Sequence, residues 1–166
     1  MGSSSDLSCG ASAPCLYGEE ARDASLPGAA ALFTRDGLAG RWHVRRRIRD
    51  ARAGGTAQME GEARFLPDAE GLRYEETGTL TLPGGQRLAS GQVYLWRFDP
   101  LPRVLFADGR LFHLLDPSRL RTVIRHLCGE DLYTGRYRMH PARWEMLWHV
   151  RGPRKDQLSR IAYRRR

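Results

Sequence analysis

The sequence predicts an all-β fold, an antiparallel up-and-down barrel of about ten strands with a short N-terminal helix. From Gly40 onward, apolar and polar residues alternate with a period of two, and breaks rich in Gly, Pro and Asp recur about every ten residues. No stretch after residue 40 keeps the period of a helix over three turns. Because a meander of this length has two exposed edges unless it closes, a barrel is expected.

The turn residues set the limits of the expected strands. We expect strands at residues 41–49, 57–66, 71–82, 86–98, 102–107, 110–115, 121–128, 131–139, 143–151 and 156–164. Most of the breaks span about two to five residues, the usual length of hairpin loops, so neighbouring strands should pair. The lack of helices between the strands argues against the α/β folds that host nucleotide cofactors.

The first part of the chain differs in composition from the rest. Residues 1–26 are rich in Ser, Ala, Gly and Pro and offer little apolar surface to bury, which predicts a disordered leader. A chain of 166 residues is short enough for one domain, a single β-barrel that we place at residues 27–166. Pro27 suits the first turn of a helix that we expect to run to Arg35 and to stop at Asp36-Gly37.

The expected barrel is strongly basic. The chain has 27 Lys and Arg against 19 Asp and Glu, but residues 1–40 hold two basic and five acidic residues. Residues 41–166 therefore carry 25 basic and 14 acidic residues, a net charge of +11. Lys155 is the single lysine of the chain, and all other basic residues of that count are arginines. This excess raises nucleic acid as a partner to be weighed.

Location is predicted from three further features. No apolar run approaches the roughly 18 to 20 residues of a membrane-spanning helix, so no membrane partner is expected. The start of the chain has neither the basic nor the apolar region of a secretory signal. Cys9, Cys15 and Cys128 are too few and too uneven for a disulfide framework. We therefore expect a cytoplasmic protein.

Alternation assigns side chains to the two faces of the sheet. In the first strand Trp42, Val44 and Ile48 alternate with arginines, so Trp42 should lie inside the barrel and the arginines in solvent. The same alternation, followed from Tyr74, places Glu76 inside. A buried carboxylate must be paired or protonated.

The start of the first strand resembles that of a known class of barrels. Gly40-Arg41-Trp42 is a Gly-x-Trp motif after a short helix, which resembles the opening of the lipocalin and calycin barrels. The resemblance implies that Gly40 is structural and that Trp42 closes the barrel floor. It also implies that an arginine of a late strand stacks on the indole in a cation–π contact. We expect Arg160 or Arg164 in that position.

The chain is also similar to domain of unknown function 6314, a family of short bacterial and fungal proteins. Four segments carry the similarity: Val93–Trp96, Phe106–His113, His126–Tyr133 and Trp148–Asp156. The similarity spans about residues 38 to 165. It implies a fold but no established activity.

Asp108-Gly109 is typical of a type I′ hairpin turn. We therefore give Asp108, Gly109 and Arg110 a structural role. Arg110 and His113 should point to opposite faces, with either one of them inside the barrel. A buried His113 would be a polar anchor for a ligand.

His126 and Cys128 share one face of a strand, and Asp131 and Tyr133 follow after a tight turn. A Cys/His pair suits metal binding or nucleophilic catalysis, but the four ligands of a structural zinc site are missing. We expect no metal ligand and no catalytic residue here. We expect instead a polar network, in which His126 bonds to a carboxylate or a tyrosine and Cys128 fills space.

The function that these features favour is binding of a small, partly apolar and anionic ligand inside the barrel. Lys155, in the last hairpin turn, would pair with the anionic group at the barrel mouth. The cofactor and the oligomeric state are left open. Haem is one candidate, because some ten-stranded calycin-like barrels bind it through a histidine. The expected ligand contacts are Tyr94, His113, His126, Tyr133, Trp148 and Lys155.

Two other functions stay open. In the first, the barrel is an enzyme in which His126 transfers a proton with Asp131 or Tyr133. In the second, surface arginines bind nucleic acid. The second is disfavoured because the aromatic residues fall on the interior and acids on the next strands can pair with the arginines. The arginines concerned are Arg45, Arg46, Arg47, Arg49 and Arg52.

Overall fold

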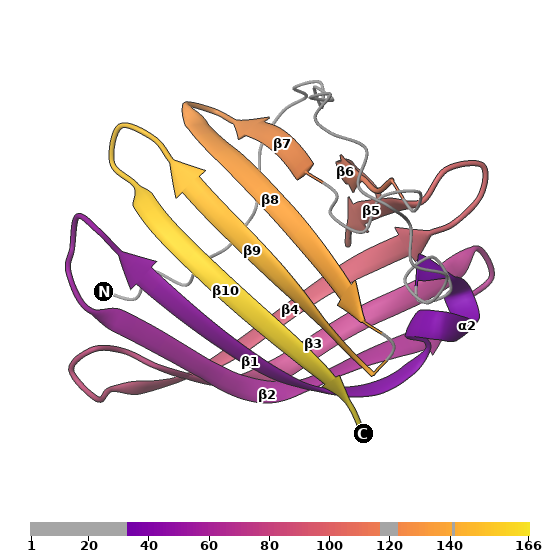
Figure 1. Cartoon of the computed structure of the whole chain (residues 1–166), viewed down its shortest axis with the longest axis horizontal. Helices are drawn as coiled ribbons and strands as arrows, with labels where there is room; N and C mark the ends of the chain where they lie inside the picture. The colour runs from indigo at the N-terminus through magenta and orange to yellow at the C-terminus, as the bar shows by residue number, and fades with distance from the viewer. Residues whose placement is uncertain (1–32, 117–122, 141) are drawn as a thin grey trace.

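Ten antiparallel strands form one continuous sheet in the computed structural model, which describes residues 33–116, 123–140 and 142–166 (Figure 1). The strands are β1 (Gly40–Asp50), β2 (Thr56–Pro67), β3 (Gly71–Thr81), β4 (Arg87–Arg97), β5 (Arg103–Phe106), β6 (Leu111–Leu114), β7 (Val123–Cys128), β8 (Asp131–His140), β9 (Arg143–Arg151) and β10 (Asp156–Arg165). Their order is β6-β5-β4-β3-β2-β1-β10-β9-β8-β7. The outer strands β6 and β7 contact each other, so the sheet curls into a nearly closed barrel.

The predicted fold class and the predicted strands are confirmed. Each strand lies beside its neighbour in sequence, and the first strand pairs with the last. Strand ends agree with the prediction to within one residue wherever they are described. The expected start of the seventh strand, at residues 121–122, lies outside the described residues.

A short helix, α2 (Arg35–Leu38), precedes the barrel. Thr34 caps it, because its Oγ1 accepts a hydrogen bond from the backbone N–H of Gly37 at 3.0 Å. A helix before the first strand is thus confirmed, but its predicted end is wrong: Asp36 and Gly37 lie within the helix, since the Thr34 cap starts the helical turn there. The leader and residues 27–32 lie outside the described residues. No helix in the described part of the chain is long and apolar enough to cross a membrane.

Trp42 closes the end of the barrel beside α2. Its side chain is fully buried, and its Nε1 donates a hydrogen bond to the carbonyl oxygen of Leu38 at 2.8 Å. The guanidinium of Arg165 lies over the indole, 4.4 Å from the ring centroid. The expected cation–π contact is present, but Arg160 and Arg164 do not make it. The register of β1 with β10 sets Arg165 opposite Trp42, whereas Arg160 and Arg164 lie on the outward face of β10.

Two glycines predicted to be structural adopt positive φ. Gly40 has a φ of 115° at the start of β1, and Gly109 has a φ of 87° between β5 and β6. The N–H of Gly109 donates to the carbonyl oxygen of Phe106, which places Ala107 and Asp108 at the centre of the turn. The hairpin is as predicted, but a type I′ turn centred on Asp108 and Gly109 is wrong. A turn followed by a glycine bulge replaces it, because the loop is one residue longer.

Candidate functional site

The inward-facing aromatic residues meet around Phe112 of β6. Its ring stacks on Trp148, with centroids 5.3 Å apart, and on Tyr94, with centroids 5.6 Å apart. The rings of His126 and His113 pack edge-on against it at 5.5 and 4.7 Å. Strands β4, β6, β7 and β9, distant from one another along the chain, therefore build one wall inside the barrel, which we call the aromatic wall.

The remaining two predicted ligand contacts differ in their surroundings. Tyr133 joins the aromatic wall, since its ring lies 6.2 Å from that of His126 and 6.4 Å from that of Trp148. Lys155 lies in the turn between β9 and β10, where its side chain is 46% exposed and its Nζ is 2.7 Å from Oδ2 of Asp131. The structure thus brings five of the six predicted contacts together and gives the sixth a carboxylate partner at the surface. Ligand contact by any of them stays a prediction.

His126 is a buried histidine that makes no hydrogen bond within the described part of the chain. Neither Nδ1 nor Nε2 has a partner there, although the residue is only 5% exposed. The predicted polar network is therefore wrong, because Tyr133 meets the imidazole only through a ring contact and Asp131 is held by Lys155. Burial lowers the pKa of His126, which keeps the ring neutral at pH 7. A neutral imidazole has one free donor and one free acceptor to offer a bound molecule.

The surroundings of His126 bear on three kinds of chemistry: nucleophilic catalysis by Cys128, metal binding and proton transfer. Cys128 is engaged in a disulfide, so it is neither the simple space filler expected nor a thiolate that the imidazole could activate. Within the described residues, no group of three or more His, Cys, Asp and Glu is arranged to hold a metal ion. No hydrogen bond joins His126 to Asp131 or Tyr133 for a proton relay.

His113 lies inside the barrel and Arg110 outside it, one of the two arrangements that the sequence left open. Arg110 is exposed and forms an ion pair with Asp108 at 2.7 Å. His113 is fully buried, and its Nε2 lies 3.1 Å from the hydroxyl of Tyr137. Burial lowers the pKa of His113 to about 3, although the hydrogen bond to the carbonyl oxygen of Leu114 acts in the opposite direction, so this imidazole is neutral and engaged.

The neutral state of His113 makes stability depend on pH. In the unfolded chain the histidine has a pKa of about 6.5, so the unfolded state binds a proton below that pH. The folded state binds this proton only below about pH 3. Stability is thus fully present above pH 6.5 and falls as the pH drops. We expect the free energy of unfolding to be about 2 kcal/mol lower at pH 5 than at pH 7 from this residue alone.

Urea unfolding between pH 7 and pH 5 measures this dependence. His113→Gln should reduce the dependence by about this amount, leaving the part due to His126, whose pKa burial also lowers. His140→Gln, at a partly exposed histidine, should preserve the dependence. An unchanged slope in the His113 variant would contradict the assignment.

A second group of inward-facing side chains is polar and charged. The Nη2 of Arg46 lies 2.7 Å from Oε1 of Glu76 and 3.1 Å from the amide oxygen of Gln92. The hydroxyl of Tyr74 donates to the other carboxylate oxygen of Glu76 at 2.5 Å and lies 3.1 Å from the hydroxyl of Tyr163. Burial, with the neighbouring Tyr163 and Glu76, raises the pKa of Tyr74, so its hydroxyl stays protonated and can donate. We call these five residues the buried polar cluster.

In the buried polar cluster, the predicted position of Glu76 is confirmed and that of Arg46 is wrong. Glu76 is inward and paired, as predicted. Arg46, grouped with the surface arginines, is instead directed inward, because it shares its strand face with Val44 and Ile48. The alternation in β1 could have revealed this. Its Nε remains buried without a hydrogen-bond partner, so the guanidinium keeps one donor free inside the barrel.

Solvent reaches part of this interior. The side chains of Gln92, Tyr94, Phe106 and Ser159 share the inward face of their strands with buried residues, yet they are partly exposed. By contrast, the residues packed on Trp42, such as Trp144, are almost fully buried. The barrel is thus sealed at its tryptophan floor and accessible beyond it.

These features define the class of the protein: a lipocalin-like, or calycin-like, antiparallel barrel with a tryptophan floor capped by a short helix. The chain belongs to DUF6314, a family of unknown function whose model matches residues 38–165. The family predicted from the sequence motifs is therefore confirmed. No curated protein matches the chain.

Solved structures share the barrel at low sequence identity. The S-type phycobiliprotein lyase CPES from Guillardia theta has a TM-score of 0.54 and 8% identity, over 80% of this chain and 90% of that chain. A protein of the DUF3598 family from Nostoc punctiforme has a TM-score of 0.46 and 11% identity, over 80% and 49% of the two chains. A de novo designed fluorescence-activating β-barrel has a TM-score of 0.38 and 15% identity, over 83% and 98%. The likeness to the lyase concerns the fold alone.

Proposed function

We propose that the barrel interior binds a small, partly apolar and anionic molecule between the aromatic wall and the buried polar cluster. The observation that carries this proposal is that, within the described residues, both ring nitrogens of His126 and the Nε of Arg46 are buried without a hydrogen-bond partner, as is the Nε1 of Trp144 at the barrel floor. A buried polar group without a hydrogen bond costs folding free energy, commonly about 1 to 3 kcal/mol. A ligand that bonds to these atoms would offset that cost.

The walls around these atoms determine the rest of the ligand. Phe112, Tyr94 and Trp148 stack on one another on the inner side of the barrel, and flat apolar groups pack well against aromatic surface of this kind. His126 and His113 are both neutral, so they add hydrogen bonds but no charge. We assign the anionic part of the ligand to Arg46. Its guanidinium donates to Glu76 through Nη2, and its Nε–H can donate to an anionic group of the ligand.

A fluorescent probe of this chemistry tests the proposal. 8-Anilinonaphthalene-1-sulfonate is small, aromatic and anionic, and N-phenyl-1-naphthylamine is its uncharged counterpart. We expect the folded protein to bind the sulfonate in the micromolar range and about tenfold more tightly than the amine. His126→Leu should weaken binding about five- to tenfold, as expected for loss of one hydrogen bond in a dry site.

Leu127→Ala is the matched control, because this exposed neighbour of His126 lies on the outer face of β7. It should leave the affinity unchanged. Native mass spectrometry and the absorbance spectrum of the purified protein would identify a co-purified ligand, including haem. Failure of the folded protein to bind either probe, or equal binding by wild type and His126→Leu, would overturn the proposal.

A further inference from the structure

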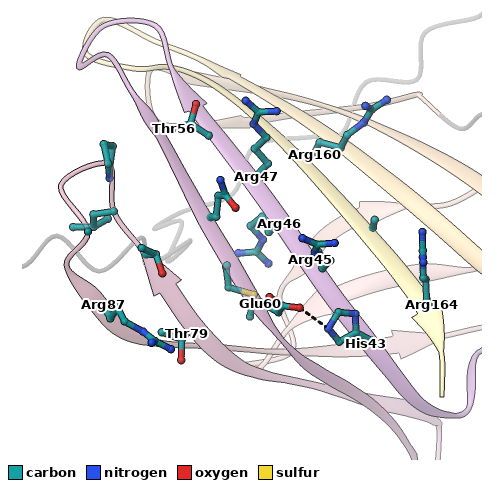
Figure 2. A pocket seen from close by; sticks show the side chains of 17 residues that line it. His43, Arg45, Arg46, Arg47, Thr56, Glu60, Thr79, Arg87, Arg160 and Arg164 are labelled. Atoms are coloured by element: carbon teal, nitrogen blue, oxygen red, sulfur yellow. Dashed lines mark hydrogen bonds and ion pairs between the residues drawn. The ribbon is translucent and has the colours of Figure 1, made fainter.

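A hollow of about 970 Å³ lies on the outer face of the barrel, across β10, β1, β2 and β3 (Figure 2). Most of the side chains that line it belong to the outward face, and the inward-facing Arg46 and Met59 also border it. The hollow therefore opens on the side of the sheet opposite the aromatic wall. Figure 2 shows the arginines of β1 and β10 side by side, with that of β4 across the hollow. We call it the arginine hollow, after Arg45, Arg47, Arg87, Arg160 and Arg164.

The charges of these arginines are not balanced within the described part of the chain. One carboxylate, that of Glu60, lines the hollow opposite Arg45, but it pairs with His43 at 3.1 Å. Glu62, beside the hollow, pairs with Arg41 and Arg166. None of the five arginines of the hollow forms an ion pair with the described residues. The expectation that acids on the following strands pair with the surface arginines is therefore wrong for Arg45 and Arg47, because those acids pair with other side chains.

The register of β1 with β10 places like charges opposite each other in the hollow, which lowers the stability of the sheet. Arg47 of β1 and Arg160 of β10 are directly opposite each other on the same outward face. Like charges in opposed positions of an antiparallel pair destabilise a sheet. Features that cost stability and bring no packing in return are typical of binding sites.

The other lining residues indicate how a ligand would be held. Thr56, Thr79, Thr81 and Gln58 add neutral hydrogen-bonding groups. Among the residues that the structure describes, no Phe, Tyr or Trp lines the hollow, so these residues offer no platform on which nucleic-acid bases could stack. Recognition here therefore depends on charge and on hydrogen bonds to oxygen atoms.

We propose that the arginine hollow binds a compact, multiply phosphorylated anion. Guanidinium groups bind phosphate through two parallel hydrogen bonds. Residues two apart on a strand are separated by about 6.7 Å and adjacent strands by about 4.8 Å, so the arginines can each contact a different phosphate of one small molecule. The concave shape and the volume suit a molecule of that size better than a long polymer.

Isothermal titration with inorganic tripolyphosphate, at about 0.15 M salt, tests this proposal. We expect binding that weakens at least about tenfold in the double variant Arg47→Gln/Arg160→Gln. The melting temperature of that variant should be unchanged or higher, since the substitution relieves like-charge repulsion. Arg138→Gln/Arg143→Gln is the matched control: it removes the same charge from exposed positions of β8 and β9 outside the hollow, and it should leave binding unchanged.

Three outcomes would overturn the proposal. The first is no tripolyphosphate binding at this salt concentration. The second is an equal loss of affinity in the double variant and in its control, which would show attraction by net charge alone. The third is tighter binding of a 20-nucleotide DNA oligomer, single-stranded or duplex, than of tripolyphosphate, with a steep loss as salt rises; this would assign the hollow to nucleic acid instead.

Discussion

Replacing Glu76 with glutamine is expected to lower the free energy of unfolding by about 3 to 5 kcal/mol. The substitution keeps the shape of the side chain but removes the charge that lies 2.7 Å from the Arg46 guanidinium. The side chains of Arg46 and Glu76 are 10% and 0% exposed, so water cannot replace the lost partner. An uncompensated guanidinium inside the barrel is the source of the cost. Urea unfolding followed by circular dichroism measures it.

Two variants separate the buried charge from other effects. Glu75→Gln changes the adjacent residue, which faces outward and pairs with Arg73 at 2.8 Å, and it should leave the unfolding curve nearly unchanged. Arg46→Met/Glu76→Leu removes both charges and should recover most of the loss, because apolar residues of similar volume often replace a buried ion pair at little cost. A Glu76→Gln protein within about 1 kcal/mol of wild type would contradict the assignment.

The barrel could be predicted because its signals are local. Alternation in β1 and β2 and the glycine or proline turns between strands depend on a few neighbouring residues, and they fix strand limits and hairpin pairing. The order of strands follows from short loops. Alternation also explains Arg165, since Ile161 and Tyr163 are inward and Arg165 shares their face.

The interior site could be predicted only in part. Tyr94, His126 and Trp148 follow from alternation, but the position of Phe112 does not. A register shift at Val104/Leu105 in the β5–β6 pair breaks the alternation, so the adjacent residues Phe112 and His113 are both buried. One-residue irregularities of this kind have no clear signal in a single sequence.

The ion-pair partner of Glu76 could not be predicted for a different reason. Its inward position was predicted, but Arg46 is 30 residues away in sequence, and the two meet only because of how β1, β2 and β3 are staggered around the barrel. An arginine within a run of arginines is also typical of a solvated face. Arg46 obeys the alternation of β1, but the surrounding arginines make its inward position hard to recognise in the sequence.

Replacing Trp42 with alanine should destabilise the protein by about 3 to 5 kcal/mol. The indole is fully buried and packs edge-on against Phe65 and Trp144, so its removal leaves a large cavity at the floor. The loss of the Nε1 hydrogen bond to Leu38 also leaves the end of α2 without its tie to β1. Thermal and urea unfolding by far-ultraviolet circular dichroism measure the change without relying on tryptophan fluorescence.

The variant Arg165→Gln distinguishes the contribution of the arginine that covers Trp42 from the contribution of the packed indole itself. Arg165 donates hydrogen bonds to the carbonyl oxygens of Ala39 and Gly37 and lies over the Trp42 ring, so it joins the C-terminal strand to the end of α2 and to the residue that follows it. Its partial exposure limits the cation–π contribution to about 1 kcal/mol or less. The glutamine variant should therefore lose far less stability than Trp42→Ala. Equal losses in the two variants would show that the arginine, and not the packing of the indole, holds the floor closed.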